Sequence, residues 1–165
     1  MKRIIAICTM IAITLCLFSG CTSKNHINQK KEANLILDEL IVALEADDTA
    51  TIKSIFAVEV QNSLNEELDI QIEEMVEYFD GDLVSYDKIR TVSGGDSVRD
   101  GVIKYSRISN ALCGKIETEI TTYSLSFSDI IVDSSNEQNE GIWRIWIGKS
   151  DTDYMIIGLS DMPLA

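Results

Sequence analysis

Apolar positions divide the chain into a helical first half and a strand-rich second half. Behind an apolar run over residues 4–18, apolar side chains recur at spacings of three and four, which places them on one face of a helix. The helices predicted in this way cover residues 32–46, 51–60 and 64–79. The pattern Ser63-Leu64-Asn65-Glu66 is that of a capping box and predicts the start of the third helix, while Gly81 can take the left-handed conformation that ends one.

β-branched and aromatic residues replace the helical spacing in the second half, and turn residues punctuate them. We expect strands over residues 83–92, 102–108, 116–132 and 142–147, whereas 154–159 is either a further strand or a tail. Turns, bends or loops are expected at 93–96, 100–101, 110–115 and 133–141. The alternation within 116–132 slips between Ile120 and Tyr123, which indicates a bulge.

Three helices followed by a meander of one-sided strands predict an α+β fold. The three N-terminal helices are expected to pack on the apolar face of a curved antiparallel sheet of four or more strands. In the strand 142–147, side chains alternate between the two faces. Trp143 shares an apolar face with Ile145 and Ile147 and is assigned to the core. This leaves Ile142, Arg144 and Trp146 on the outer face, with the indole of Trp146 beside Arg144.

The pair Arg144 and Trp146 has two interpretations. The indole could be half covered by its neighbours and stacked with the arginine. Alternatively, the pair could form a surface for a partner protein or a second copy of the chain, because Trp and Arg are enriched at the centres of interfaces. The sequence alone supports both.

Five short motifs carry a resemblance to a known family: residues 50–56 (ATIKSIF), 79–81 (FDG), 84–86 (VSY), 94–95 (GG) and 141–145 (GIWRI). The order of elements resembles the NTF2-like (cystatin-like) superfamily, whose cone-shaped domains often leave a pocket between helices and sheet. The motifs are similar to a family of Gram-positive lipoproteins, number 5104 among the domains of unknown function. The resemblance covers most of residues 32–148, and it implies no activity and no functional residues.

The N-terminus reads as an export signal. Lys2 and Arg3 precede the apolar run 4–18, which is shorter than the about 20 apolar residues of a transmembrane helix. The run ends in Leu17-Phe18-Ser19-Gly20-Cys21, which resembles the lipobox of bacterial lipoproteins. That resemblance implies cleavage after Gly20 and a diacylglyceryl thioether on Cys21, with palmitate-type chains that anchor the protein to the extracytoplasmic face of the cell membrane.

The expected organisation is therefore a signal peptide over 1–20, a lipidated N-terminus and flexible tether over 21–31, and one domain over 32–165. The only histidine, His26, lies in the tether, where a metal or catalytic role is not expected. Cys8 and Cys16 would leave with the signal and Cys21 would be acylated, so we expect Cys113 to be buried and unpaired, with no disulfide.

Charge excludes one class of partner. Removing residues 1–20 leaves 12 basic residues against 27 acidic ones, a net charge of −15, which repels nucleic acid and gains nothing from anionic lipid headgroups. The lipid would then do the anchoring. Eight acidic residues lie between 66 and 82, and we interpret them as the solvated side of an amphipathic helix rather than as a surface for calcium or a cationic partner. A calcium loop would need a ligand at position 84, which is Val84.

Catalytic signals are weak. The sequence lacks a histidine triad, a Cys–His pair, a zinc ligand set and a phosphate-binding glycine loop, so no catalytic residue, metal or cofactor is predicted. As an alternative, a desolvated carboxylate beside Tyr86, Tyr105 or Tyr123 could act as in isomerases of the NTF2-like superfamily.

Three functions remain open at this level. The first is a lipid-anchored surface module that binds a small molecule or an envelope protein. The second is a pocket enzyme of the isomerase or dehydratase type, and the third is an immunity lipoprotein that captures a toxin. A buried carboxylate at a pocket would favour the enzyme, whereas a filled core with an exposed Trp146 would favour protein binding.

Overall fold

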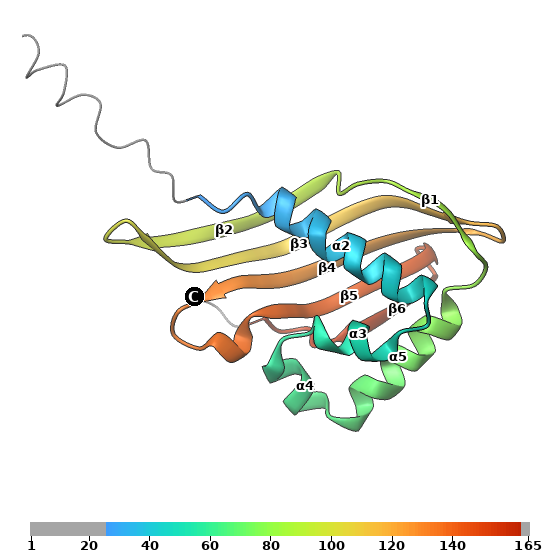
Figure 1. Cartoon of the computed structure of the whole chain (residues 1–165), viewed down its shortest axis with the longest axis horizontal. Helices are drawn as coiled ribbons and strands as arrows, with labels where there is room; N and C mark the ends of the chain where they lie inside the picture. The colour runs from blue at the N-terminus through green and yellow to red at the C-terminus, as the bar shows by residue number, and fades with distance from the viewer. Residues whose placement is uncertain (1–25, 163–165) are drawn as a thin grey trace, which may run out of the picture.

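The computed structural model describes residues 26–162 and contains four α-helices followed by six strands (Figure 1). The helices are α2 (Gln29–Glu45), α3 (Thr49–Ser54), α4 (Val58–Leu64) and α5 (Glu66–Tyr78). The strands are β1 (Leu83–Tyr86), β2 (Thr91–Arg99), β3 (Val102–Thr118), β4 (Thr122–Asp133), β5 (Gly141–Ser150) and β6 (Asp153–Gly158), with a 3₁₀ turn η1 (Glu137–Asn139) before β5. The predicted α+β class is confirmed. Within residues 26–162, no helix is both long and apolar enough to cross a membrane.

The strands form one antiparallel sheet in the order β1-β3-β4-β5-β6. β3 is 17 residues long, so β1 and β2 both pair with it, β2 along its first two thirds and β1 at its end. The helices lie on one side of this sheet: α2 runs across β2 and β3, whereas α5 contacts β6 (Figure 1). The opposite face, called the outer face below, has no helix of the described chain on it.

The core lies between the helices and the inner face of the sheet. The apolar faces predicted for the first and third helices point into it, and each fully buried aliphatic side chain stabilises the fold by about 1.5–3 kcal/mol. Its members from α2, α5 and the sheet include Leu37, Leu40, Leu44, Leu68, Ile72, Met75, Leu125, Ile145 and Ile147.

The second predicted helix, 51–60, is wrong as a single element. The backbone of Ile142 at the start of β5 pairs with the segment between α3 and α4: its N–H donates to Ile55 at 2.9 Å, and its carbonyl accepts from Ala57 at 3.0 Å. A chain that bonds to a strand in this way cannot also continue its helical hydrogen bonds. The helix therefore breaks near Phe56, and four helices result instead of three.

The predicted capping box does not form. Ser63 lies in the last turn of α4, and the residue that precedes α5 is Asn65, which has φ 48° and makes no side-chain capping bond. The first helix also begins earlier than predicted. The side chain of Asn28 accepts a bond from the N–H of Lys31 at 3.1 Å, so α2 starts at Gln29, and residues 29–31 are not part of a tether.

The predicted strand 116–132 is two strands. The chain reverses over residues 119–121, where the N–H of Thr118 donates to the carbonyl of Thr121 at 2.9 Å. The slip in alternation near Ile120 is thus a hairpin turn between β3 and β4 and not a bulge. The predicted turns and bends at 93–96 and 110–115 lie inside β2 and β3, where the pairing has irregularities, and 154–159 falls largely within β6.

Candidate functional site

The outer face of β5 carries the two side chains that the sequence singled out. Trp143 is 4% exposed and donates its indole N–H to the carbonyl of Asn139 at 2.8 Å, which confirms its assignment to the core. Arg144 and Trp146 are half-buried and alternate with the core residues Ile145 and Ile147. The assignment of Ile142 to the same outer face is wrong: it is fully buried where the segment between α3 and α4 pairs with it. The structure therefore brings Arg144 and Trp146 together on the face that the helices leave open.

Trp146 is held in place by a neighbour that the sequence left undecided. Its indole stacks on the ring of Tyr154 in β6, with ring centroids 5.8 Å apart and an interplanar angle of 29°. Gly148 lies beside the indole of Trp146. A Cβ atom at this position would lie only 2.9 Å from the indole carbon Cζ2, so the glycine makes space for the ring. The stacking partner of Trp146 is thus Tyr154, and the stack on Arg144 that the sequence suggested is not formed.

A pocket of about 230 Å³ opens beside Trp146. The pairing of β3 with β4 passes from Ile108 to Ala111, so Ser109 and Asn110 form an irregularity that turns toward this pocket. Ser126 in β4 stands directly opposite Trp146, and the small serine beside the large indole leaves the hollow. The remaining lining residues are Phe127, Arg144 and Ile156.

The pocket is positive in an acidic protein. The whole chain carries a net charge of −13, yet the lining within residues 26–162 includes no aspartate or glutamate. Lys53, Lys88 and Arg90 each pair with a carboxylate, whereas the guanidinium of Arg144 has no ion pair or hydrogen bond with any described residue. Arg144 is consequently available to a ligand.

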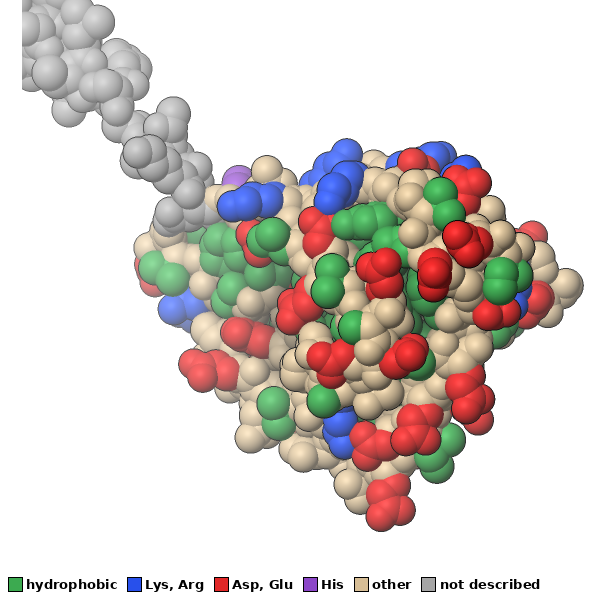
Figure 2. All heavy atoms as spheres, turned by 45° about the vertical axis from the view of Figure 1, so that its right-hand side comes forward, with side chains coloured by type: hydrophobic (Ala, Val, Ile, Leu, Met, Phe, Trp, Pro, Cys, Tyr) green, Lys and Arg blue, Asp and Glu red, His purple; other side chains and the backbone are tan. Residues whose placement is uncertain are grey.

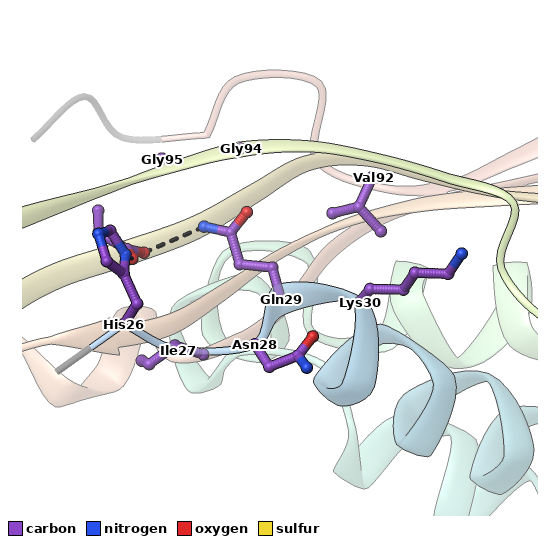
Figure 3. Close-up of a pocket in the computed structure, with 9 residues that line it drawn as sticks. His26, Ile27, Asn28, Gln29, Lys30, Val92, Gly94 and Gly95 are labelled. Atoms are coloured by element: carbon purple, nitrogen blue, oxygen red, sulfur yellow. Dashed lines mark hydrogen bonds and ion pairs between the residues drawn. The ribbon is translucent and has the colours of Figure 1, made fainter. Parts of the chain in front are cut away.

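A second cavity, of about 400 Å³, lies at the start of α2 beside β2 (Figure 3). Its polar groups bond to one another. The carboxylate of Asp96 accepts from Ser106 at 2.7 Å, from His26 at 2.8 Å and from Gln29 at 3.0 Å. Burial opposes the charge, but these hydrogen bonds hold the pKa of Asp96 below its ordinary value. The cluster therefore fastens the start of α2 to the sheet and leaves few free groups for a ligand.

The structure also reveals a buried carboxyl group that the sequence did not indicate. Asp129 in β4 is 3% exposed, and its side chain has no hydrogen-bond partner among the described residues. Burial raises the pKa of Asp129 to about 7, and the negative charges of Glu140 and Glu32 act in the same direction. The one signal in the sequence is that Asp129 stands at the next alternate position after Leu125 and Phe127, on the face that these apolar residues share.

Neither Tyr86 nor Tyr123 bonds to a desolvated carboxylate, which the isomerase alternative requires. The hydroxyl of Tyr86 donates to Asp38 at 2.9 Å, and that of Tyr123 donates to the carbonyl of Tyr78 at 2.8 Å. The carboxylate of Asp38 is 40% exposed and pairs with Lys88, so it is not the desolvated group that this alternative requires.

The acidic run of α5 faces solvent. Glu66, Glu67, Glu73 and Glu74 are exposed, and Figure 2 shows acidic side chains spread over this side of the molecule. Within the described residues, no group of three or more His, Cys, Asp or Glu side chains is placed to hold a metal ion.

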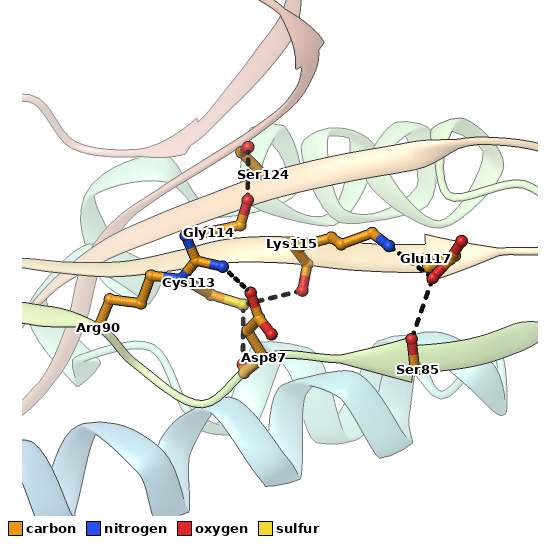
Figure 4. Close-up of polar contacts among 8 residues, drawn as sticks. All are labelled: Ser85, Asp87, Arg90, Cys113, Gly114, Lys115, Glu117 and Ser124. Carbon is orange, nitrogen blue, oxygen red and sulfur yellow. Dashed lines mark hydrogen bonds and ion pairs between the residues drawn. The ribbon is translucent and has the colours of Figure 1, made fainter.

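Cys113 is a buried thiol in β3, as predicted (Figure 4). Its Sγ donates to the carbonyl of Asp87 at 3.1 Å, and burial raises the pKa of the thiol. Arg90 forms an ion pair with Asp87 and covers Gly114, so the neighbourhood of Cys113 is closed by the fold.

Gly20 and Cys21, the predicted cleavage and lipidation residues, lie outside the described residues. Residues 39–153 match the sequence model of DUF5104, a domain of unknown function. No curated protein matches the chain.

Proposed function

We propose that this chain, which belongs to the DUF5104 family, is an extracytoplasmic binding module held at the cell membrane by a lipid on Cys21. The observation that carries the binding function is the outer-face pocket. It joins an unpaired guanidinium, free hydroxyl and amide groups and a fixed indole on the side of the sheet opposite the helices. Few convergent polar groups beside an aromatic wall are typical of ligand sites.

The proposed anchor leaves the domain little freedom to move away from the bilayer. His26 bonds to Asp96 at 2.8 Å and lies only five positions after Cys21, so the lipidated residue is close in the chain to a residue held by the fold. An extended chain spans at most about 3.6 Å per residue, which limits this separation to about 18 Å. We infer that the start of α2 lies nearest the membrane.

We propose that the fold belongs to the NTF2-like superfamily, because the helices precede the strands along the chain as they do in that superfamily. In such domains the pocket between helices and sheet is the usual ligand site, whereas here aliphatic residues of α2 and α5 pack against the inner face. A filled inner face and an open outer face favour binding over catalysis. Toxin capture and self-association are other uses of the same outer face.

Catalysis remains the second candidate, and Asp129 is the observation that favours it. A carboxyl group whose pKa lies near 7 can exchange protons at neutral pH. Such a role would require a substrate to reach a side chain that is 3% exposed.

The anchor is tested by Cys21→Ala in a bacterial host supplied with labelled palmitate. We expect the label in the wild-type protein and in Cys113→Ser, whose substituted residue is buried in the domain. The Cys21→Ala protein should carry no label and should remain unprocessed or leave the membrane fraction, because each buried methylene of the lipid contributes about 0.8 kcal/mol to anchoring. Equal labelling of Cys21→Ala would contradict the proposal.

A further inference from the structure

We infer, resting on the binding function proposed above, that the outer-face pocket takes a small organic carboxylate. Its charge would lie at Arg144, and its flat or apolar body against Trp146 and Ile156. This assigns a ligand class to the pocket and a separate role to each of its walls.

Charge selects an anion. Arg144 presents a planar set of donors that fits the two oxygens of a carboxylate, and no described residue occupies those donors. The overall charge of −13 repels anions at long range, so attraction at this point must come from within the pocket. A cation would meet a guanidinium and find no carboxylate among the described lining residues.

Further donors come from β3 and β4. The side chains of Ser109, Asn110 and Ser126 line the pocket and make no hydrogen bond with any described residue. Hydroxyl and amide groups can donate to the oxygens of an anion, and charge-assisted bonds of this kind are roughly twice as strong as neutral ones. These three side chains can therefore complete the coordination that Arg144 begins.

The apolar wall sets the rest of the ligand. The stack on Tyr154 fixes the indole of Trp146, and Ile156 is 49% exposed beside it, so an apolar ligand would cover surface that water now contacts. A volume of about 230 Å³ is below the roughly 300–1,000 Å³ of sites for drug-sized molecules. The ligand is accordingly the size of one substituted ring.

The test is a titration of the full-length chain in detergent micelles with 4-fluorobenzoate, followed by the ¹⁹F signal of the probe. The neutral analogue 4-fluorobenzamide is the matched probe, and it also reports partition into micelles. We expect saturable binding of the benzoate and at least tenfold weaker binding of the benzamide. Arg144→Gln should weaken benzoate binding at least tenfold. Arg99→Gln, which changes an arginine whose side chain is 83% exposed at the β2–β3 turn, should leave it unchanged.

A second arm separates the two sources of a carboxylate. The peptide N-acetyl-Gly-Phe with a free C-terminus is compared with its amide. If the free-acid peptide binds more tightly than its amide, and about as tightly as 4-fluorobenzoate, the natural ligand is a peptide C-terminus. If 4-fluorobenzoate binds and the peptide does not, the natural ligand is a free small molecule. Both results support the inference.

Three results would overturn it: no saturable binding of either acid, equal binding of acids and amides, or full affinity in Arg144→Gln. Any of these with palmitate labelling at Cys21 intact would reject the ligand class and leave the proposed anchoring standing. Equal palmitate labelling of the wild-type and Cys21→Ala proteins would reject the anchoring and leave the ligand class standing.

Discussion

Replacing Trp143 with alanine is expected to lower the free energy of unfolding by about 3–5 kcal/mol, enough to unfold a domain of ordinary stability. The indole is 4% exposed in the core, and its N–H bonds to Asn139 at 2.8 Å. Its removal would leave a cavity and an unpaired carbonyl. Urea denaturation of a chain covering residues 24–165 measures the change.

Trp146→Ala is the matched control, because it removes the same side chain from the same strand on the opposite face. The half-buried indole contributes chiefly its stack on Tyr154, so we expect a loss of about 1 kcal/mol. Acrylamide quenching in Trp143→Phe and Trp146→Phe proteins gives an independent check, with Trp146 the more accessible residue. A more accessible Trp143, or equal losses of stability, would reverse the assignment of the two faces.

Asp129→Asn is expected to stabilise the protein, and increasingly so as the pH rises. The folded state holds the pKa of Asp129 at about 7, against an ordinary value of 3.8. Between these values the folded state keeps a proton that the unfolded state has released, so this group lowers stability as the pH rises. The loss is complete above pH 7 and is on the order of 4 kcal/mol, at about 1.4 kcal/mol per unit of pKa.

An amide at position 129 carries no charge for Glu32 and Glu140 to repel, so the variant lacks this loss. Urea denaturation at pH 4.5, 6 and 8 should show a difference between variant and wild type that grows with pH. Glu73→Gln, on the exposed side of α5, is the control and should change stability by less than about 0.5 kcal/mol throughout. A constant difference between Asp129→Asn and wild type would mean that the carboxyl ionises normally in the folded protein.

Local periodicity was sufficient for the elements whose side-chain directions depend on their own backbone. The buried faces of α2 and α5 follow from spacings of three and four, and the division of Trp143 from Trp146 follows from alternation in one strand. The burial of Cys113 was predicted on another basis, from the chemistry of an unpaired thiol and the lack of a partner cysteine.

Local patterns failed where a distant segment supplied the hydrogen bonds. The break between α3 and α4 depends on Ile142, some 86 positions beyond Phe56, and no feature of residues 51–60 reports that pairing. The slip near Ile120 fits a bulge and a turn equally well, because both interrupt alternation. His26 was assigned to a free tether, and only the approach of Asp96 from β2 holds it to the fold.

The candidate site shows the same division. The sequence by itself determined that Arg144 and Trp146 share a face, and it marked Cys21 as the expected anchor. Only the tertiary structure decided that Ser109 and Asn110 reach the same pocket, that Tyr154 holds the indole and that Asp129 is buried without a partner. The reason is physical: alternation along one strand is a local property of its backbone, whereas pairing register, cavities and desolvation arise from segments that the chain brings together only on folding.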